Sequence, residues 1–248
     1  MILQQRIHRT YLEFQEEKGA MYTADLFFGS YIVAAVLKCC TCALINIRPY
    51  QAAILQAHNL YRSREPAANM RALVWDNFLA YRAAQWTETC YFEHQRRGFG
   101  ENLSYFTSTG PPLSSRTAVQ RSIGLWAAER PLWGRGPQCG AACHYTQLIW
   151  ATTTRVGCAL SYCPSLRVGM SQIQRNSQYF ACFYSPPGNF IGQLPFIPGP
   201  RCSRCGRGQA CVRGLCSPMP FGRRRRRSAK LSTKSEFLGI VHERSDGV

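Results

Sequence analysis

The chain has 248 residues and a formal net charge of +17, with 46% hydrophobic and 12% aromatic residues. This apolar content is enough for a packed core and excludes a wholly disordered chain, and the length fits one domain with appendages. The positive charge favours anionic partners such as glycans, membranes or acidic proteins. Nucleic acid is disfavoured because the sequence contains no nucleic-acid-binding motif.

Thirteen cysteines are unusually many for a chain of this length, and ten of them lie from Cys90 onward. Such density indicates an oxidised disulfide framework of the kind found in secreted proteins. The odd number implies that at least one thiol is unpaired or bonds to another chain.

An N-terminal segment, residues 1–48, contains the apolar run Leu26–Leu37. Twelve residues are fewer than the roughly 20 that span a membrane, but they suit the core of a signal peptide if translation starts at Met21. The sequence therefore predicts a secreted, extracellular protein. A membrane-anchored protein, held by residues 26–45 across Lys38, is the alternative, and a buried core helix is a third interpretation.

Three helices are predicted next. The first begins near Gln51, where apolar residues recur at helical spacing. Asp76 is placed to cap a second helix. A stretch rich in glycine and proline, residues 98–112, is read as a loop. The third helix covers Thr117–Glu129, with Val119, Ile123 and Trp126 facing inward and Pro131 ending it.

Strand-like runs follow, rich in β-branched and aromatic residues: Tyr145–Trp150, Arg155–Tyr162 and Gln178–Tyr184. Helices followed by strands predict an α+β domain of packed layers, which we place at residues 49–192.

A cysteine-rich hinge is placed at residues 193–217, where a Pro/Gly linker, Leu194–Pro200, leads into four closely spaced cysteines. It has too few apolar residues to fold by burial alone, so cross-links must hold it together. Its four cysteines are Cys202, Cys205, Cys211 and Cys216, and they can pair in three ways. A zinc site is disfavoured because only the first two have Cys-x-x-Cys spacing and the context is oxidising.

The basic tail, residues 218–248, is predicted to be disordered. Its run Arg223–Arg227, followed by Ser228, fits a proprotein-convertase site, a patch for an anionic glycan, or a nuclear signal. The cysteines argue against the nuclear signal. A solvated, unprocessed tail is equally consistent with the sequence.

Four polar residues are candidates for one site: His94, Glu101, Glu129 and His144. Imidazoles and carboxylates are suitable ligands for Zn²⁺ or another divalent cation. Glu129 follows Trp126 by one helical turn and so shares its inward face. Spacing along the chain does not establish that the four converge, and unrelated histidines and glutamates at the surface are the alternative.

A set of motifs in fixed order resembles the CAP superfamily of cysteine-rich secretory, venom-antigen and pathogenesis-related proteins, from about Gln51 to Asn189. The motifs are His58-Asn59-x-x-Arg62, Pro66-Ala67-Ala68-Asn69-Met70, Trp75-Asp76, Gly100-Glu101-Asn102-Leu103, Trp126-x-x-Glu129, His144-Tyr145-Thr146-Gln147-x-x-Trp150, Gly157-Cys158 and Cys182-x-Tyr184-x-Pro186-x-Gly188-Asn189. Within the superfamily the chain is most similar to the secreted peptidase inhibitors and glioma pathogenesis-related proteins. Cys143 departs from the family pattern.

The resemblance implies a three-layer α-β-α sandwich. It implies that His94 and His144 are the zinc-binding pair of some members, and that Glu101 and Glu129 are acids of the same cleft. It also implies hinge disulfides Cys202–Cys211 and Cys205–Cys216.

The predicted function is a non-enzymatic binding module with a zinc-capable cleft and a role as a peptidase inhibitor. Its partner would be an extracellular protease or receptor, or a sterol or lipid. No motif makes Ser104 a nucleophile, and Cys143 is expected in a disulfide. Sterol or lipid carriage and metal-dependent hydrolysis in the same cleft are the alternatives. Asn102 begins the one N-glycosylation sequon, although its place beside Glu101 suggests that it is enclosed.

Overall fold

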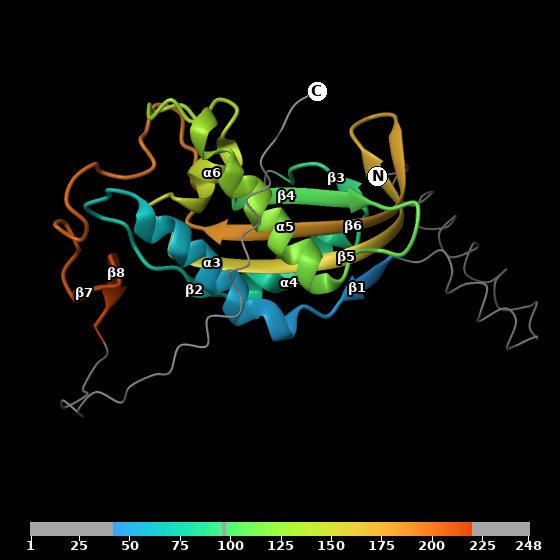
Figure 1. Ribbon diagram of the computed structural model, residues 1–248, viewed down its shortest axis with the longest axis horizontal. Coiled ribbons are helices and arrows are strands. Elements are labelled where there is room, and N and C mark those ends of the chain that lie inside the picture. Colours follow the sequence, from blue (N-terminus) through green and yellow to red (C-terminus); the bar gives the residue numbers. More distant parts are fainter. Residues whose placement is uncertain (1–41, 96–97, 220–248) are drawn as a thin grey trace, which may run out of the picture. The chain divides into compact units, whose positions relative to one another are not determined.

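The computed structural model describes residues 42–95 and 98–219 (Figure 1). The predicted signal-peptide core and the arginine run of the tail lie outside these residues. The proposed anchor segment 26–45 lies outside them up to residue 41, and its last three residues form a strand of the sheet. In the described part of the chain, no helix combines the length and apolarity needed to cross a membrane.

A sheet forms the centre of the domain. Its main strands are hydrogen-bonded in the order β1-β5-β6-β4 and are antiparallel throughout. They are β1 (Ala43–Ile45), β5 (Arg155–Val168), β6 (Gln172–Ser185) and β4 (Gly100–Thr107). Two short strands, β2 (Val74–Trp75) and β3 (Tyr91–Phe92), pair in parallel with β5. The sheet therefore begins at Ala43, before the predicted start of the domain at residue 49.

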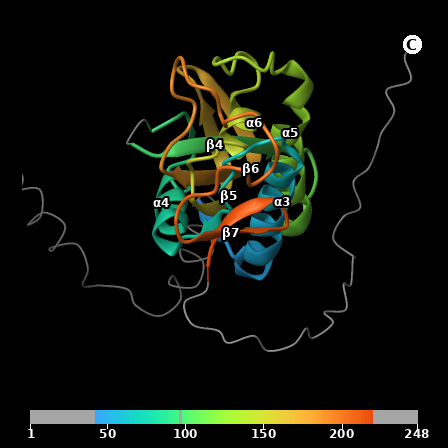
Figure 2. The same ribbon diagram turned by 90° about the vertical axis from the view of Figure 1, so that its left-hand side faces the viewer.

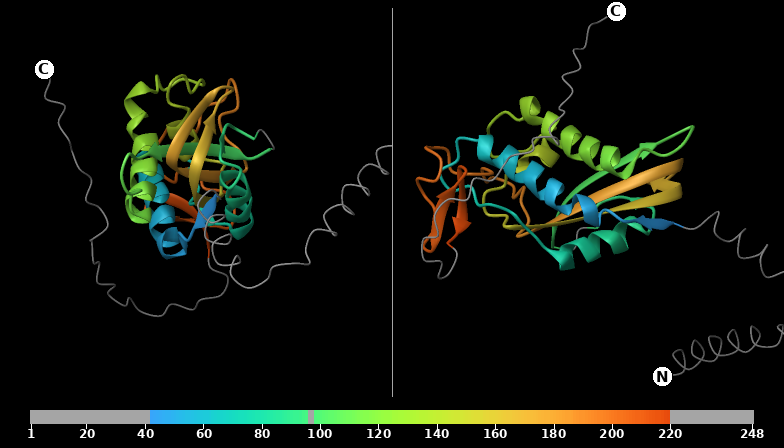
Figure 3. Two further views of the ribbon diagram at one scale, coloured as in Figure 1. Left: turned by 90° about the vertical axis from the view of Figure 1, so that its right-hand side faces the viewer. Right: turned by 60° about the horizontal axis from the view of Figure 1, so that its bottom comes forward.

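Helices cover both faces of this sheet (Figures 2 and 3). On one face lie α3 (Gln51–Arg64), α5 (Ser115–Ala128) and the short α6 (Cys143–Leu148), and on the other lies α4 (Asn77–Thr87). Two 3₁₀ turns, η1 (Arg48–Tyr50) and η2 (Arg130–Leu132), precede α3 and follow α5. The predicted three-layer α-β-α sandwich is thus confirmed.

Strand β6 shows why both faces must be covered. Successive side chains of a strand point to opposite faces. Phe180, Cys182 and Tyr184 join the core beneath α3, α5 and α6. Tyr179, Ala181 and Phe183 join the core beneath α4. The continuous apolar run of this strand reflects burial on both sides.

The predicted starts of α3 and α4 agree with the structure, whereas α5 begins at Ser115, ahead of the predicted Thr117. The Asp76 carboxylate accepts hydrogen bonds from the backbone N–H groups of Phe78 and Leu79 and caps α4. Ser114 caps α5 in the same way. Helix α5 ends at Ala128, and Pro131 lies in the 3₁₀ turn that follows. One glycine fixes how closely α4 packs: a Cβ on Gly157 would lie 2.2 Å from the backbone nitrogen of Ala80.

The prediction of a loop over residues 98–112 was wrong for its first half. Strand β4 occupies Gly100–Thr107 and pairs with β6 along its whole length. The flanking glycines and prolines obscured it, and its side chains do not alternate simply between apolar and polar because both of its faces are covered.

Five disulfides cross-link the described residues, and all ten cysteines from Cys90 onward take part. The pairs are Cys90–Cys163, Cys139–Cys143, Cys158–Cys182, Cys202–Cys211 and Cys205–Cys216. The two hinge pairs are those that the resemblance implies. Among the described cysteines Cys42 is free.

The hinge packs on the domain instead of standing apart from it. Its hairpin, β7 (Gln209–Val212) and β8 (Leu215–Pro218), buries Leu215 in the main core. Backbone hydrogen bonds join Cys216 to Met70 and Ala72, and Arg204 to Ala68. Disulfides and these contacts together replace the core that the hinge lacks.

Candidate functional site

His144 lies on a helix, and the predicted strand at Tyr145–Trp150 was wrong. Helix α6 spans Cys143–Leu148. The Glu129 carboxylate accepts hydrogen bonds from the backbone N–H groups of His144 and Tyr145, at 3.0 and 3.1 Å, and so serves the free donors at the start of this helix. A tertiary contact thereby overrides the strand preference of the tyrosine, threonine and isoleucine in this run.

The same carboxylate also fixes the His144 ring. Its second oxygen lies 2.6 Å from Nδ1 of His144. The Trp126 ring stacks on the imidazole with an interplanar angle of 16°. Because Nδ1 is engaged, Nε2 is the ring nitrogen left for a ligand.

His94 forms a second pair of the same kind. Its Nδ1 lies 3.0 Å from Oε2 of Glu101, which also accepts the backbone N–H of Gln95. The Glu101 side chain is only 3% exposed. Its other oxygen, Oε1, is buried and has no protein partner among the described residues. A buried carboxylate oxygen in this state needs a donor that the described residues do not supply, such as a water molecule.

The two pairs lie on opposite faces of β4. Glu101 pairs in register with Phe183, whose side chain is in the core beneath α4, while Asn102 pairs with Cys182 in the other core. The four residues do not form one cluster: in the described residues, groups of three or more metal-ligating atoms within 4.8 Å of one another consist of cysteines only. Since β4 is the edge strand, side chains from its two faces can meet around that edge.

A chain of buried hydrogen bonds connects α6 to strands β4 and β6 and to helix α3. Nδ2 of Asn102 donates to the His144 carbonyl and to the Tyr184 hydroxyl, which lies 3.0 Å from Nε2 of His58. Nδ1 of His58 donates to the Ile54 carbonyl, so the hydroxyl of Tyr184 donates to the neutral Nε2. Asn102 is fully buried and its amide nitrogen is engaged, so glycosylation there is incompatible with the folded domain.

The residues of the His58-Asn59-x-x-Arg62 motif therefore serve the scaffold. Asn59 exchanges two hydrogen bonds with the backbone of Leu73. The buried Arg62 guanidinium contacts five backbone carbonyl oxygens, those of Arg71, Leu148, Trp150, Ala151 and Thr153. Sequence reasoning noted these residues only as family markers, and nothing in their spacing revealed the carbonyls that they serve.

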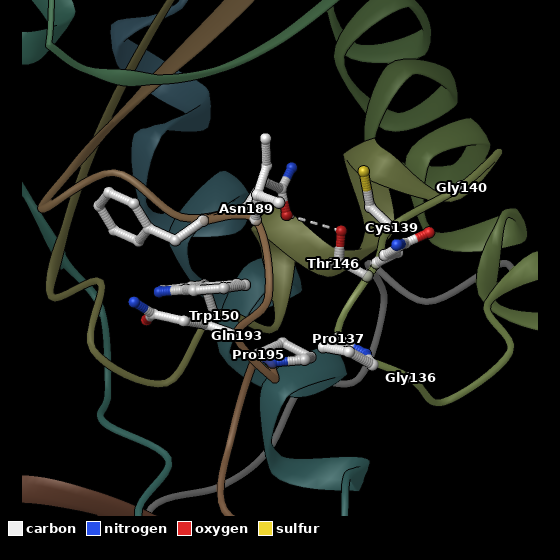
Figure 4. Close-up of a pocket in the computed structure, with 12 residues that line it drawn as sticks. Gly136, Pro137, Cys139, Gly140, Thr146, Trp150, Asn189, Gln193 and Pro195 are labelled. Carbon is white, nitrogen blue, oxygen red and sulfur yellow. Dashed lines mark hydrogen bonds between the residues drawn. The ribbon is translucent and has the colours of Figure 1, made fainter.

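A cavity of about 290 Å³ opens on the other side of α6 (Figure 4). It is lined by the loop Gly136–Gly140, by Thr146 and Trp150, and by Asn189, Phe190, Ile191, Gln193 and Pro195 of the loop 189–195. The hydroxyl of Thr146 donates to the side-chain oxygen of Asn189, which ties the 189–195 loop to the helix. Sequence reasoning did not find this cavity, because its walls come from two loops far apart in the chain.

Ser104 and Cys143, the candidate nucleophiles near the site, are each engaged in another bond. The Ser104 hydroxyl donates to that of Ser122, which donates to a helix carbonyl, and no histidine of the described residues bonds to either of them. Cys143 is bonded to Cys139, as expected from the sequence. The described site therefore lacks the nucleophile–base contact that covalent catalysis requires.

The layered α-β-α domain, with paired histidines and glutamates at the sheet edge and five disulfides, defines a class of disulfide-bonded protein. The comparison with known families agrees with this class. The profile described as "Cysteine-rich secretory protein family", CAP, matches residues 55–184. The chain belongs to the CAP family.

Its relatives include named peptidase inhibitors. Peptidase inhibitor 15-A of Danio rerio is 39% identical over 189 residues, which cover 67% of this chain and 69% of that protein. Peptidase inhibitor 15 of Homo sapiens is 37% identical over 186 residues, with the same two coverages. The crystal structure of NaASP2 with Zn²⁺ is similar in fold, with a TM-score of 0.55 and 26% identity over 68% of this chain and 95% of that one.

Proposed function

We propose that this CAP protein is a secreted binding module without enzymatic activity, and that it inhibits an extracellular peptidase. The observation that carries the proposal is that the Glu129 carboxylate is fully engaged in hydrogen bonds within the protein. Both oxygens of Glu129 are consumed in capping α6 and orienting His144. A carboxylate held in this way supports a rigid surface and is not available as a general base. The names of the relatives support a peptidase as the target.

The cavity beside α6 supports a protein partner over a lipid. Its volume, about 290 Å³, is at the lower limit of pockets that hold whole small molecules and suits one side chain of a docked protein. Phe190 and Ile191, which line the cavity, and the nearby Leu194 are exposed in the loop 189–195. Apolar side chains around a small pocket are typical of the centre of a protein interface.

Replacing Ile191 with aspartate should weaken inhibition of the target peptidase by more than about tenfold, since a charge would be buried at the interface. Ile191 is 96% exposed, so the fold should be unaffected. Met170→Asp is the matched control, because Met170 is 97% exposed in the turn between β5 and β6. The measurement is the inhibition constant of the purified chain against a panel of secreted peptidases.

Equal inhibition by Ile191→Asp and Met170→Asp would show that the cavity rim is not part of the interface with the peptidase. Turnover of a peptide library by the protein alone, lost in Glu101→Gln, would overturn the non-enzymatic proposal in favour of hydrolysis. Saturable binding of a radiolabelled sterol that Ile191→Asp abolishes, with no peptidase inhibited, would favour lipid carriage.

We further propose that His94 and His144 bind a divalent cation such as Zn²⁺ through Nε2. The donor set fits: each imidazole has its Nδ1 engaged by a carboxylate, the usual arrangement behind a metal-binding histidine. With two protein ligands, the remaining positions would be open to water or to a partner's side chain, and the cation would act as a bridge or Lewis acid there. The solved relative that contains Zn²⁺ supports the choice of metal.

In calorimetric titration with Zn²⁺, His144→Ala and His94→Ala should each abolish binding if the two rings share one ion. Glu129→Gln should weaken it by about 10- to 100-fold, because the ring loses the carboxylate that orients it. Val212→Ala, at an exposed position in the hinge hairpin, is the control. Two independent binding events, each lost in only one histidine variant, would contradict a shared site.

A further inference from the structure

An arginine-rich surface lies where the hinge meets the end of α3. Residues 193–219 contain no aspartate or glutamate and four arginines: Arg201, Arg204, Arg207 and Arg213. Arg64, the last residue of α3, and Arg130, which follows α5, adjoin them. All basic residues of the described chain are arginines, with no lysine among them. The positive charge of this surface is therefore carried by guanidinium groups.

Backbone contacts bring three of these arginines together. Arg201 donates from Nε to the Glu65 carbonyl and from its terminal nitrogen to the Arg64 carbonyl, at 3.2 and 2.9 Å. The turn Arg213–Gly214 packs against the same place: a Cβ on Gly214 would lie 3.3 Å from Cδ of Arg201. Because the hinge is cross-linked by two disulfides, this arrangement is held before any ligand arrives.

Apart from Arg130, which pairs with Glu65, the arginines of this surface are not neutralised locally. The one acid beside it, Glu65, is 4% exposed and is engaged by Arg130 and by the Tyr145 hydroxyl. Arg64, Arg201 and Arg213 take part in none of the ion pairs of the described residues. Each of these three is exposed.

We propose that Arg64, Arg201 and Arg213, with Arg130 beside them, form a binding surface for a sulfated polysaccharide. Guanidinium groups offer paired N–H donors that match the oxygens of a sulfate ester. An extended polyanion can contact several such groups at once and release its counterions. Anionic lipid is the less suitable partner, because it is concentrated in the cytoplasmic leaflet, whereas five disulfides place this chain in an oxidising compartment.

The test uses the full chain with Arg223–Arg227 replaced by serine, so that the tail does not mask the effect. This protein should bind immobilised heparin, and Arg64→Ser with Arg213→Ser should weaken binding by about tenfold, since each surface ion pair contributes a few-fold. The dependence of log Kd on log salt should fall by about one per arginine removed. Neither arginine donates a side-chain hydrogen bond to the fold, so the domain should stay folded.

The control is the double variant Arg121→Ser with Arg175→Ser, which removes the same charge from exposed positions on α5 and β6. It should change heparin affinity less than about twofold. Equal losses in both doubles would show a nonspecific charge effect and overturn the proposal. So would absence of heparin binding, binding to fully desulfated heparin, or tighter binding to vesicles of phosphatidylserine than to heparin.

Discussion

Replacing Arg62 with leucine should lower the free energy of unfolding by more than about 4 kcal/mol, because several buried carbonyl groups would lose their donor together. Arg62 is fully buried and is the common partner of carbonyls in the segment 148–153 and of Arg71. Burial lowers its pKa to about 9, so the group is still protonated at neutral pH and can donate from all its nitrogens.

The position of these carbonyls explains why the effect should reach the site. Leu148 is the last residue of α6, and the guanidinium bonds its carbonyl and those just beyond. Arg62 thus places a positive charge at the negative end of the helix that carries His144. Its loss should loosen α6 before the rest of the sandwich.

Chemical unfolding in urea measures this directly, with Arg64→Leu as the control. Arg64 lies half a turn away on the same helix but is exposed, so its substitution should change stability by less than about 1 kcal/mol. If Arg62→Leu yields no folded protein, Arg62→Lys, which retains the charge but loses the forked geometry, should still be destabilised by several kcal/mol. Wild-type stability in either variant would show that the carbonyls find other donors.

Stability should also fall on mild acidification because of His58. Burial lowers the pKa of this histidine to about 4, from an ordinary value of 6.5. The unfolded chain therefore binds the proton more readily than the folded one. The stabilisation is fully present above pH 6.5 and is lost as the pH falls toward 4, by about 3 kcal/mol in total.

Urea midpoints at pH 7, 5.5 and 4.5 would check this, since the wild type should lose stability over this range more steeply than His58→Gln. The other titratable groups affect both proteins alike, so the difference between their slopes of stability against pH isolates the contribution of His58. NMR titration of the His58 ring in the native protein is an independent measurement. A ring that titrates near pH 6.5 without loss of structure would contradict the buried, neutral state.

Several elements could be predicted from the sequence because local chemistry decides them. Asp76 and Pro131 mark the start of α4 and the end of α5 through contacts within a few residues. Val119, Ile123 and Trp126 are buried as the helical period predicts. Strands β5 and β6 extend beyond their predicted ends because they pair with each other, and pairing is a property of two segments.

Other elements depend on partners far along the chain. Helix α6 occupies a run whose composition favours a strand. It forms a helix because Glu129, fifteen residues before His144, caps it. Strand β4 lies within a stretch that resembles a loop, and it exists because β6 offers an open edge. Neither signal is present in the local sequence, so both predictions failed there.

The sequence by itself determined the family, the layered fold class, the oxidised framework and the identity of the four polar residues, since these depend on residue type and order. The tertiary structure alone decided how those residues are used. It joins His94 to Glu101 and His144 to Glu129 on opposite faces of one edge strand, and it buries Asn102 behind α6. Hydrogen bonding and burial depend on distances in space. The order of polar residues along the sequence does not specify which of them come into contact in the folded protein.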